Sequence, residues 1–484
     1  MDEVSTTRDS GWVVAASDAK ASFFQRLCAA LYEPVDISFL VFFRIVFGGI
    51  MLWEVYRYFT SGWITRYFVA PAVNFTYYGF SWVKPWPGRG MYIHFFVIGL
   101  AAACVMAGFL YRIAAPVLFL TFTYSFLLDQ TRYMNHFYLV CLISFLMCFL
   151  PAERAFSIDA LLRRKIRSDV VPAWTLWLLR VQVGIPYFYG GLAKLNSDWI
   201  PGGEPMRTWL RPLTAVPEIG AIFKAEWLVY SFVIGGLVLD LFVVPLLLWR
   251  RTRPFAFAAA ILFNLINSVI FDIGIFPWLM LGALFIYFPP DLVRRFARAF
   301  MSPGEEFLDA KPLQVSEKTF TPQKLVVGLL ATYLAIQLIL PLRHYLYPGN
   351  VSWTEEGHNF AWHMKLRTKT GEAVFTVTHP ETGQTWTIKP EDYLESHQVT
   401  KVITKPDLLV HFSHYLAELK RREGFENVEV RAHVMVSLNG RAPQLLIDPN
   451  VDLAKEQASL LPTRWILPLT TPLGNGGTGA FDDE

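Results

Sequence analysis

Apolar segments long enough to cross a membrane follow one another along the first 342 residues of the chain. Each is close to the ~20 residues that an α-helix needs to span the hydrocarbon core of a bilayer. Segments 254–271 and 272–288 run together, and Pro277 could either kink one helix or lie near the start of a second, so the count is eight or nine. The pattern predicts a mainly α fold, a polytopic membrane helix bundle of about nine spans at 38–58, 91–111, 112–128, 136–152, 173–194, 226–249, 254–271, 272–288 and 324–342.

From about residue 343 the pattern becomes that of a small globular domain. Two β-forming runs flank the turn sequence Glu-Thr-Gly-Gln at 381–384, which predicts a hairpin. The runs are 373–379 and 385–389, followed by an amphipathic helix at 408–419 and by strands at 428–438 and 445–447. We expect a transmembrane domain over 37–342, a soluble α+β domain over 343–471, and a Gly-rich, acidic and disordered tail over 472–484.

The composition supports a membrane protein and argues against a nucleic-acid partner. Hydrophobic residues make up 54% of the chain and charged residues only 17%, which is too apolar for a surface that faces water. The net charge is +3, and the basic residues form no long tract that could follow phosphates. The lipid bilayer is the expected partner.

The cysteines and the first residues limit the class further. The four cysteines, Cys28, Cys104, Cys141 and Cys148, show no CxxC spacing, so we expect neither a zinc site nor a disulfide-stapled ectodomain, and no metal is predicted. Residues 1–36 carry mixed charges without an apolar core, which is not the pattern of a cleavable signal.

Lysine and arginine predict the orientation. If residues 1–36 are cytoplasmic, the basic clusters of the short loops all lie on the cytoplasmic side, as the positive-inside rule requires. These clusters are 163–167, 250–253 and 294–298. With nine spans the C-terminal domain is then non-cytoplasmic. The loop at 59–90 lies on that same outer side, and its tryptophans and tyrosines are typical of a membrane interface.

Three motifs carry little weight. The tail holds a GxGxxG pattern at Gly474, Gly476 and Gly479, but no strand precedes it and no helix can follow it, so we reject a dinucleotide site. His411 and His414 lie one helical turn apart without a third ligand, and a structural role is favoured over a metal site. The glycosylation sequons at Asn74 and Asn350 are short enough to occur by chance.

Polar side chains within the spans are the informative residues, because a charge at mid-bilayer costs roughly 2.5–3.5 kcal/mol on insertion scales. They are Arg44, Arg180, Asp240, Asn264, Asn267 and Asp272. For Arg44, Arg180 and Asp240 we favour pairing with one another inside the bundle. A proton or substrate path is the alternative.

Lys194 stands out from these residues. Tyr187, Gly190, Gly191 and Lys194 recur on one helix face, and the two glycines leave space beside the amine. Burial disfavours the ammonium form of a lysine, so such an amine can act as a base. The alternative is a lysine at the end of a span that extends its amine to the membrane surface.

A second polar cluster favours the functional interpretation of Lys194. The turn between the predicted third and fourth spans reads Leu-Asp-Gln-Thr-Arg-Tyr-Met-Asn-His at 128–136, and the nine-span topology puts it on the same side as Lys194. An acid, an amide and an imidazole could therefore meet the amine near the membrane surface.

At these positions the chain resembles a known family. The segments FLLDQTRYMNHFYL, YGGLAKLNSDW and LFNLINSVIFDIGIFPW resemble the membrane region of the vitamin K-dependent gamma-glutamyl carboxylases. The segment PLRHYLYPGNVSWTEEGHNFAWHM resembles the continuation into their soluble domain. The similarity covers roughly residues 40–470, and the chain looks like a short, bacterial-type member with the horizontally transferred transmembrane domain.

The resemblance implies a reaction and its residues. Reduced vitamin K, phylloquinol or menaquinol, reacts with O2 and becomes an epoxide, and the strongly basic oxygenated intermediate removes a γ-proton from a glutamyl side chain, which then adds CO2. The family's lysine that deprotonates the quinol matches Lys194. Its Asn-His pair matches Asn135 and His136, and its nearby tyrosine matches Tyr187.

Residues of the soluble part are candidates for binding a glutamate-containing peptide or protein. They fall where this domain should cover the outer mouth: Arg343, His344, Trp353, His358, Trp362 and His363. Asn264 stands where animal members carry a histidine, so that role does not transfer. The chain also lacks the long C-terminal portion of animal members, which bears on recognition of propeptide-tagged substrates.

Three functions are compatible with these observations. The favoured one is a carboxylase of the vitamin K-dependent type in a bacterial inner membrane. The second is a quinol epoxidase or oxidoreductase without protein carboxylation. The third is a non-enzymatic transporter or proton path through Arg44, Asp240, Asn264 and Asp272, for which those groups would matter more than Lys194.

Overall fold

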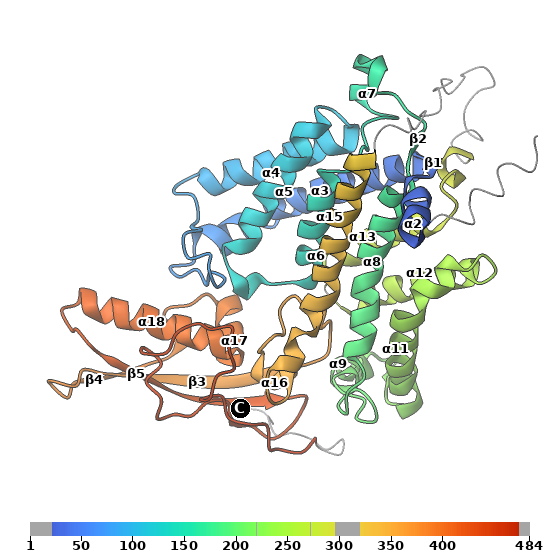
Figure 1. Ribbon diagram of the computed structural model, residues 1–484. Coiled ribbons are helices and arrows are strands. Elements are labelled where there is room, and N and C mark those ends of the chain that lie inside the picture. Colours follow the sequence, from blue (N-terminus) through green and yellow to red (C-terminus); the bar gives the residue numbers. More distant parts are fainter. Residues whose placement is uncertain (1–21, 219, 272, 296–319, 474–484) are drawn as a thin grey trace, which may run out of the picture.

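The computed structural model describes residues 22–218, 220–271, 273–295 and 320–473 of the chain. Its described part is mainly helical, with short strands near the N-terminal side of the bundle and a sheet near the C-terminal end (Figure 1). Asp272, most of the segment 1–36 and the GxGxxG pattern of the tail lie outside the described residues.

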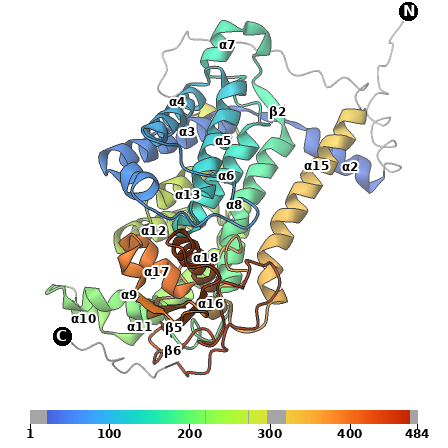
Figure 2. The same cartoon turned by 90° about the vertical axis from the view of Figure 1, so that its left-hand side faces the viewer.

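The helices of the bundle occupy the first three quarters of the chain. They are α2 (Phe23–Tyr32), α3 (Ser38–Thr60), α4 (Gly90–Ala107), α5 (Tyr111–Leu127), α6 (Asn135–Met147), α7 (Ile158–Leu162), α8 (Ala173–Ala193), α9 (Met206–Leu210), α10 (Gly220–Phe223), α11 (Glu226–Leu248), α12 (Arg253–Ile270), α13 (Phe276–Leu284) and α15 (Phe320–Ile339). Two short antiparallel strands, β1 (Pro34–Asp36) and β2 (Val170–Pro172), join the start of α3 to the start of α8. In Figure 2, α15 runs beside α2 at the edge of the bundle.

Five described helices are long and apolar enough to cross a membrane, judged by length and composition. They are Ser38–Thr60, Gly90–Ala107, Glu226–Leu248, Arg253–Ile270 and Gln323–Leu346. Shorter apolar helices stand at three further predicted spans, and α8 stands at the remaining one. The protein is thus an integral multi-pass membrane protein by its helices, while the number nine stays a prediction.

The segment 254–288 forms two helices rather than one. α12 ends at Ile270 and α13 begins at Phe276, with Pro277 in its first turn. Proline is tolerated there because the first N–H groups of a helix lack intrahelical acceptors. The second of the two readings of Pro277 is therefore confirmed.

Arg44 and Arg180 do not pair with Asp240, so that expectation was wrong. The Arg44 guanidinium donates to the carbonyl oxygen of Ala152 at 2.8 Å, and Arg180 Nε donates to the carbonyl oxygen of Ile286 at 2.8 Å. Ala152 lies in the loop between α6 and α7, and Ile286 lies in the 3-10 turn Phe285–Tyr287 that follows α13. These backbone carbonyl groups satisfy the arginines without a carboxylate.

The C-terminal part carries a four-stranded antiparallel sheet in the order β4-β3-β5-β6. Its elements are α16 (Val351–Thr354), β3 (Lys369–Thr378), β4 (Thr385–Ile388), α17 (Ser396–Thr404), α18 (Pro406–Arg422), β5 (Glu429–Leu438) and β6 (Gln444–Leu445). The predicted hairpin is confirmed, since β3 pairs with β4 around the turn at Gly383, whose φ of +70° suits a residue without a Cβ. The helix α18 packs on the sheet through Phe412, whose ring centroid lies 5.0 Å from that of Phe375.

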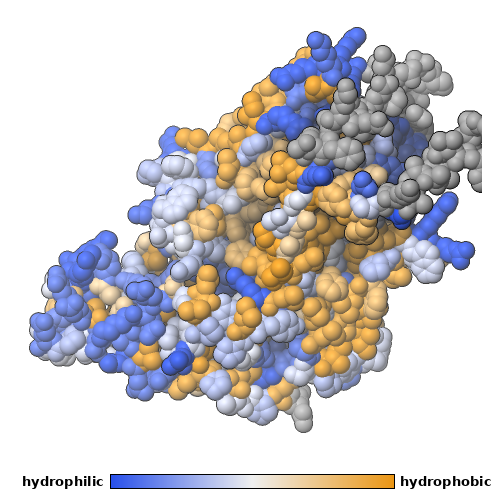
Figure 3. All heavy atoms as spheres, viewed as in Figure 1, coloured by the Kyte–Doolittle hydropathy of each residue, from blue (hydrophilic) through white to orange (hydrophobic). Residues whose placement is uncertain are grey.

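Several buried polar contacts attach this part to the bundle, and two of them, which we call anchors, involve Gln398 and Arg441. Gln398 on α17 donates to Asp129 Oδ2 at 3.0 Å, in the turn before α6. Arg441 forms a buried two-pronged ion pair with Asp198, at 2.5 and 2.7 Å, in the loop after α8. Figure 3 shows hydrophobic side chains over the bundle and hydrophilic ones gathered over the end of the sheet and α18. The anchors hold the sheet part against the ends of α6 and α8.

Candidate functional site

Lys194 caps the C-terminal end of α8. The glycines of the Tyr187–Lys194 face do more than leave space, because α11 fills it. A Cβ on Gly191 would lie 2.7 Å from Leu241 Cδ2 on α11, and one on Gly190 would lie 2.9 Å from Met364 Cε. The absence of a Cβ at Gly191 lets α11 pack close to α8, as small residues do at helix contacts in membranes, and its absence at Gly190 makes room for Met364.

This close packing brings Asp240 of α11 to the lysine. Lys194 Nζ lies 2.5 Å from Asp240 Oδ2 and donates to the carbonyl oxygen of Gly190 at 3.2 Å. Both side chains of the ion pair are buried, at 7% and 4% exposure. The ring of Trp199 lies 5.4 Å from the amine. The predicted lysine therefore has a carboxylate partner that the sequence argument did not assign to it.

One cavity of about 910 Å³ contains all four predicted catalytic residues in its lining: Asn135, His136, Tyr187 and Lys194. Helices α6, α8, α11, α12 and α13 contribute its walls, and Asp240, Asn264 and Asn267 also line it. Most other lining side chains are apolar, among them Trp199, Phe232, Phe263, Phe271, Phe276 and Met280. A large apolar space with a few polar groups is the usual form of a small-molecule site.

Two hydrogen bonds hold Asn135 in one orientation. The Tyr133 hydroxyl donates to Asn135 Oδ1 at 2.9 Å, and Asn135 Nδ2 donates to the carbonyl oxygen of His363 at 3.0 Å. The backbone N–H of Phe360 donates to the Tyr133 hydroxyl at 2.7 Å. The loop after α16 therefore takes part in positioning a residue of the cavity.

Tyr187 has a buried hydroxyl without a hydrogen-bond partner among the described residues, although it faces Asn264. The Asn264 amide donates to the carbonyl oxygen of Ala260 at 2.8 Å. A buried polar group left unpaired costs about 1–3 kcal/mol. The Tyr187 hydroxyl is thus available to a molecule that enters the cavity.

The six residues predicted to bind substrate lie outside the lining of this cavity. Trp353 belongs to the core of the sheet part, and Trp362 packs on Tyr138 with ring centroids 5.0 Å apart. Arg343 donates to the carbonyl oxygen of Asn359 at 2.8 Å. The three histidines cluster instead, with ring centroids 4.7 Å apart for His344 and His363 and 5.2 Å apart for His358 and His363. Their assignment to substrate binding stays a prediction.

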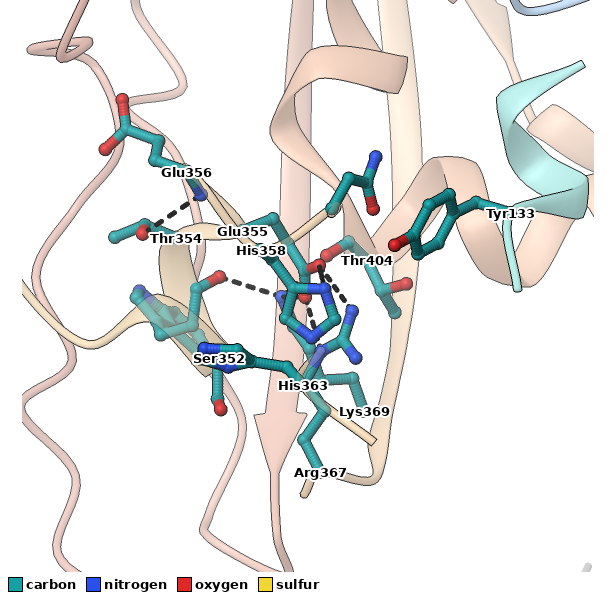
Figure 4. Close-up of polar contacts among 12 residues, drawn as sticks. Tyr133, Ser352, Thr354, Glu355, Glu356, His358, His363, Arg367, Lys369 and Thr404 are labelled. Carbon is teal, nitrogen blue, oxygen red and sulfur yellow. Dashed lines mark hydrogen bonds and ion pairs between the residues drawn. The ribbon is translucent and has the colours of Figure 1, made fainter. Parts of the chain in front are cut away.

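Next to these histidines lies a buried ionic cluster around Glu355 (Figure 4). Arg367 binds the carboxylate through two nitrogens, and Lys369 Nζ lies 3.3 Å from Glu355 Oε1. Lys369 also donates to the carbonyl oxygens of Trp353 and Thr404, at 2.8 and 2.6 Å. The cluster satisfies its charges internally.

The cluster sets the protonation of its members. Burial acts to raise the pKa of Glu355, but Arg367 and Lys369 hold that pKa well below its usual range. Burial, with the neighbouring His344 and Arg367, lowers the pKa of His363 to about 3. Glu355 is therefore charged and His363 neutral at pH 7, and the two ring nitrogens of His363 have no hydrogen-bond partner among the described residues.

Two lysines of the C-terminal part line the cavity and were missed by the sequence argument. They are Lys365, whose amine lies 4.7 Å from the centroid of the Phe271 ring, and Lys401 on α17. Burial, together with Lys405 and Arg367, lowers the pKa of Lys401 to about 8. Nothing in their spacing distinguishes them from surface lysines. Asp240 did carry a signal, since a lone acid in an apolar span needs a cationic partner.

His411 and His414 do not face this cavity. The His411 ring stacks on Phe75 at 6.5 Å, and His414 Nε2 lies 2.7 Å from the carbonyl oxygen of Glu456. The His411 ring is partly buried and His414 is exposed, and the structural role favoured for this pair stays a prediction.

Two family models match the chain. The model of the HTTM domain matches residues 32–292, which is more than half of the chain, and the helices of that range form the walls of the cavity. The fold and the match define a multi-pass membrane protein with this domain. The model of the vitamin K-dependent gamma-carboxylase lumenal domain matches residues 322–472. The chain therefore belongs to the vitamin K-dependent gamma-carboxylase family. No solved structure matches the chain significantly.

Proposed function

We propose that this protein is a membrane enzyme that couples epoxidation of a reduced naphthoquinone by O2 to γ-carboxylation of protein glutamate with CO2. The observation that carries the proposal is the apolar cavity whose lining contains both the Lys194–Asp240 ion pair and Asn135, His136 and Tyr187. The family match supports a reaction of this class.

The cavity fits a reduced vitamin K such as phylloquinol or menaquinol. Its volume of about 910 Å³ and its apolar lining suit a bicyclic ring with part of an isoprenoid chain. The unpartnered Tyr187 hydroxyl and the Asn135 amide are suited to the polar ends of such a ring. When bound, the quinol supplies the reducing power for O2 and the strong base that the carboxylation of glutamate needs.

The residues of the cavity have separate roles in this proposal. Lys194 Nζ accepts a proton from a quinol hydroxyl, and Tyr187 and His136 orient the ring. Asn135, fixed by Tyr133 and by the backbone of the loop at 360–363, offers its remaining N–H to a carbonyl or carboxylate oxygen. The apolar walls exclude water, which would otherwise quench strongly basic groups.

The C-terminal part supplies the side of the cavity that meets the glutamyl substrate. Among the described lining residues Asp240 is the one carboxylate, and Lys194 neutralises it. Lys401 adds a cationic group beside this neutralised pair, which suits a carboxylate. In our proposal, six residues that lie outside the cavity lining support this region: Arg343, His344, Trp353, His358, Trp362 and His363.

The architecture belongs to the same proposal. We assign about nine spans over 37–342, a cytoplasmic segment at 1–36, a non-cytoplasmic α+β domain at 343–471 and a disordered tail at 472–484, in a bacterial inner membrane. A quinol would then enter from the lipid, and a peptide would enter from water on the side of the sheet.

Purified protein in lipid tests the proposal. We would supply a reduced naphthoquinone, O2, labelled bicarbonate and a glutamate-containing peptide, and measure epoxide and labelled peptide. Native protein should form both, and Lys194→Ala should lose about 10²–10⁴-fold of both rates, as expected for a general base. The exposed Lys165→Ala variant is the control. Absence of both products from native protein would sink the proposal.

A quinol epoxidase without protein carboxylation is the second candidate. The observation in its favour is that the six predicted substrate-binding residues do not line the cavity. Epoxide without labelled peptide in the same assay would select it. A transporter instead predicts that Arg44 matters more than Lys194, although Arg44 is held by backbone carbonyls away from the cavity lining.

A further inference from the structure

The Lys194–Asp240 pair raises a question about the state of the base. A lysine amine can accept a proton only if it is not already protonated to the ammonium form. The 2.5 Å contact with a buried carboxylate stabilises the ammonium form of Lys194, in which the amine has no free lone pair. A simple neutral-amine base, which the sequence argument favoured, does not fit this contact.

Asp240 offers a second proton acceptor, in direct contact with the amine. Asp240 Oδ2 contacts Lys194 Nζ, the carbonyl oxygen of Gly190 accepts a second N–H of the amine, and both side chains line the cavity. The ammonium group has three donors. The described residues engage two of them, which leaves the third for a molecule in the cavity.

We propose that Asp240 is the terminal proton acceptor of the site and that Lys194 passes the proton to it. In this step an N–H bond of Lys194 first breaks and an O–H bond to Asp240 Oδ2 forms, which gives the nitrogen a lone pair. The amine then turns about its Cε–Nζ bond, the O–H bond of a quinol hydroxyl breaks, and a new N–H bond to Lys194 forms. One proton moves from the quinol to Asp240, and the lysine ends as it began, as an ammonium group.

The charge balance favours this relay over a neutral amine. Before the step one ion pair exists, between Lys194 and Asp240, and after it one ion pair exists, between Lys194 and the deprotonated quinol oxygen. A neutral amine would instead create an ion pair where none existed. Separating charge in an apolar cavity is expensive, whereas exchanging one partner of an existing pair is not. The inference rests on the proposed function, because the proton comes from the quinol.

Infrared difference spectroscopy reads the proton on Asp240 directly. Reduced naphthoquinone is added to the protein in lipid without O2 and without bicarbonate, so that no turnover occurs. The native protein should gain the C=O stretching band of a protonated carboxyl group, and the band should shift when aspartate is labelled with ¹³C. Asp240→Asn should lack the band.

Glu54→Gln is the matched control for this experiment. Glu54 is a buried carboxylate of α3 that forms an ion pair with Arg57 at 2.9 Å and does not line the cavity. Its variant should keep the band. A band that survives in Asp240→Asn, or a native protein that binds the quinol without any band, overturns the relay. Epoxide formation by such a protein would leave the proposed function intact.

A measurement without quinol tests the pair itself. In Lys194→Met the carboxylate loses its cation, and a lone buried carboxylate takes up a proton. The band should then be present at pH 7 before any ligand is added, and Lys194→Met/Asp240→Asn should lack it. An Asp240 that stays ionised in Lys194→Met is not coupled to the lysine, and the relay fails.

Turnover separates the relay from a structural role of Asp240. Asp240→Asn should lower the rate of epoxidation about 100-fold, within the range of a proton-transfer group, with the affinity for the quinol unchanged. Asp240→Glu keeps the acceptor and should recover part of the rate. Equal losses in both variants would mean that shape rather than the proton matters, and would overturn the inference.

Discussion

Two buried ionic sites of this molecule have opposite surroundings. Lys194 and Asp240 face a large cavity, beside a tyrosine hydroxyl without a partner. Glu355, Arg367 and Lys369 lie within the C-terminal part, lining no part of that cavity, and their charges are satisfied by one another and by backbone carbonyls. Similar chemical groups are thus accessible to a ligand in the first site, whereas in the second they stabilise the packing of the C-terminal part.

The largest expected effect is on protein stability, and it comes from the ionic cluster around Glu355. Glu355→Gln leaves Arg367 and Lys369 buried without their anion, and breaking a buried ion pair costs about 3–5 kcal/mol. Thermal unfolding in lipid or detergent measures this loss. Asp240→Asn should cost clearly less, because it leaves one cation, Lys194, without its anion, whereas Glu355→Gln leaves two. Glu418→Gln, on the exposed face of α18, is the control without an expected change. Equal losses for Glu355→Gln and Asp240→Asn would remove the contrast between the sites.

The second-largest expected effect is a loss of stability in acid, at the ionic cluster around Glu355 and the neighbouring His363. The pKa of His363 is about 3 in the folded protein, well below its unfolded value of 6.5, so between these values only the unfolded chain binds the proton. Stability must therefore fall as the pH falls from 6.5 toward 3, by up to about 1.4 kcal/mol per pH unit for one such group. The lowered pKa of Glu355 adds to this loss below pH 4.5, where the unfolded carboxylate takes up a proton first.

His363→Gln checks the histidine contribution, because glutamine does not titrate. Its unfolding free energy between pH 6.5 and pH 4.5 should depend less on pH than that of the native protein. His397→Gln is the comparison variant. His397 lies in a different place, near Arg132, and burial lowers its pKa to about 4. An unchanged slope in His363→Gln would show that the acid sensitivity comes from elsewhere.

A smaller effect is expected at the cavity wall. Lys401→Met should raise KM for the peptide about tenfold, as the loss of one charged contact predicts, and should leave peptide-independent epoxidation unchanged. Because the pKa of Lys401 is about 8, its ammonium form is lost above that pH, and KM of the native protein should rise there. The exposed Lys389→Met variant controls for net charge. A lower epoxidation rate with unchanged KM would contradict this role.

The smallest effect concerns the positioning of Asn135. Tyr133→Phe removes one hydrogen bond to Asn135 Oδ1, worth about 1 kcal/mol, which corresponds to a severalfold loss in kcat. The control is Tyr189→Phe, which removes a hydroxyl that donates to the carbonyl oxygen of Leu338 instead. The rate of labelled-peptide formation distinguishes the two variants. Equal rates would mean that the Asn135 amide needs no such support.

Much of the cavity side of this comparison could be predicted from the sequence. The helix periodicity put Tyr187 and Lys194 on one face, and the turn at 128–136 brought Asn135 and His136 to the same end of the bundle. These are short-range patterns, readable from spacing alone. Pro277 was ambiguous only because proline suits both a kink and the first turn of a helix.

The partners of these residues could not be predicted, because they depend on how helices pack. Asp240 meets Lys194 through the close approach of α11 at Gly191, and one sequence does not show which helices are neighbours. Arg44 and Arg180 donate hydrogen bonds to backbone carbonyl oxygens rather than to an acid. The candidate substrate-binding residues from Arg343 to His363 do not line the cavity, and Phe360 and Trp362 in that segment adopt positive φ values of 66° and 59° that sequence spacing does not reveal.

The hydrogen bonds between Tyr133, Asn135 and the loop at 360–363 have a consequence for how such proteins can be recombined. The two matched ranges, 32–292 and 322–472, end and begin well away from this contact, yet the contact joins them. A chimaera that pairs this HTTM domain with a foreign C-terminal domain would therefore have an incorrectly oriented Asn135 amide in its cavity. Grafting must carry residues 358–364 along with the helices, so the unit of exchange is larger than either matched range.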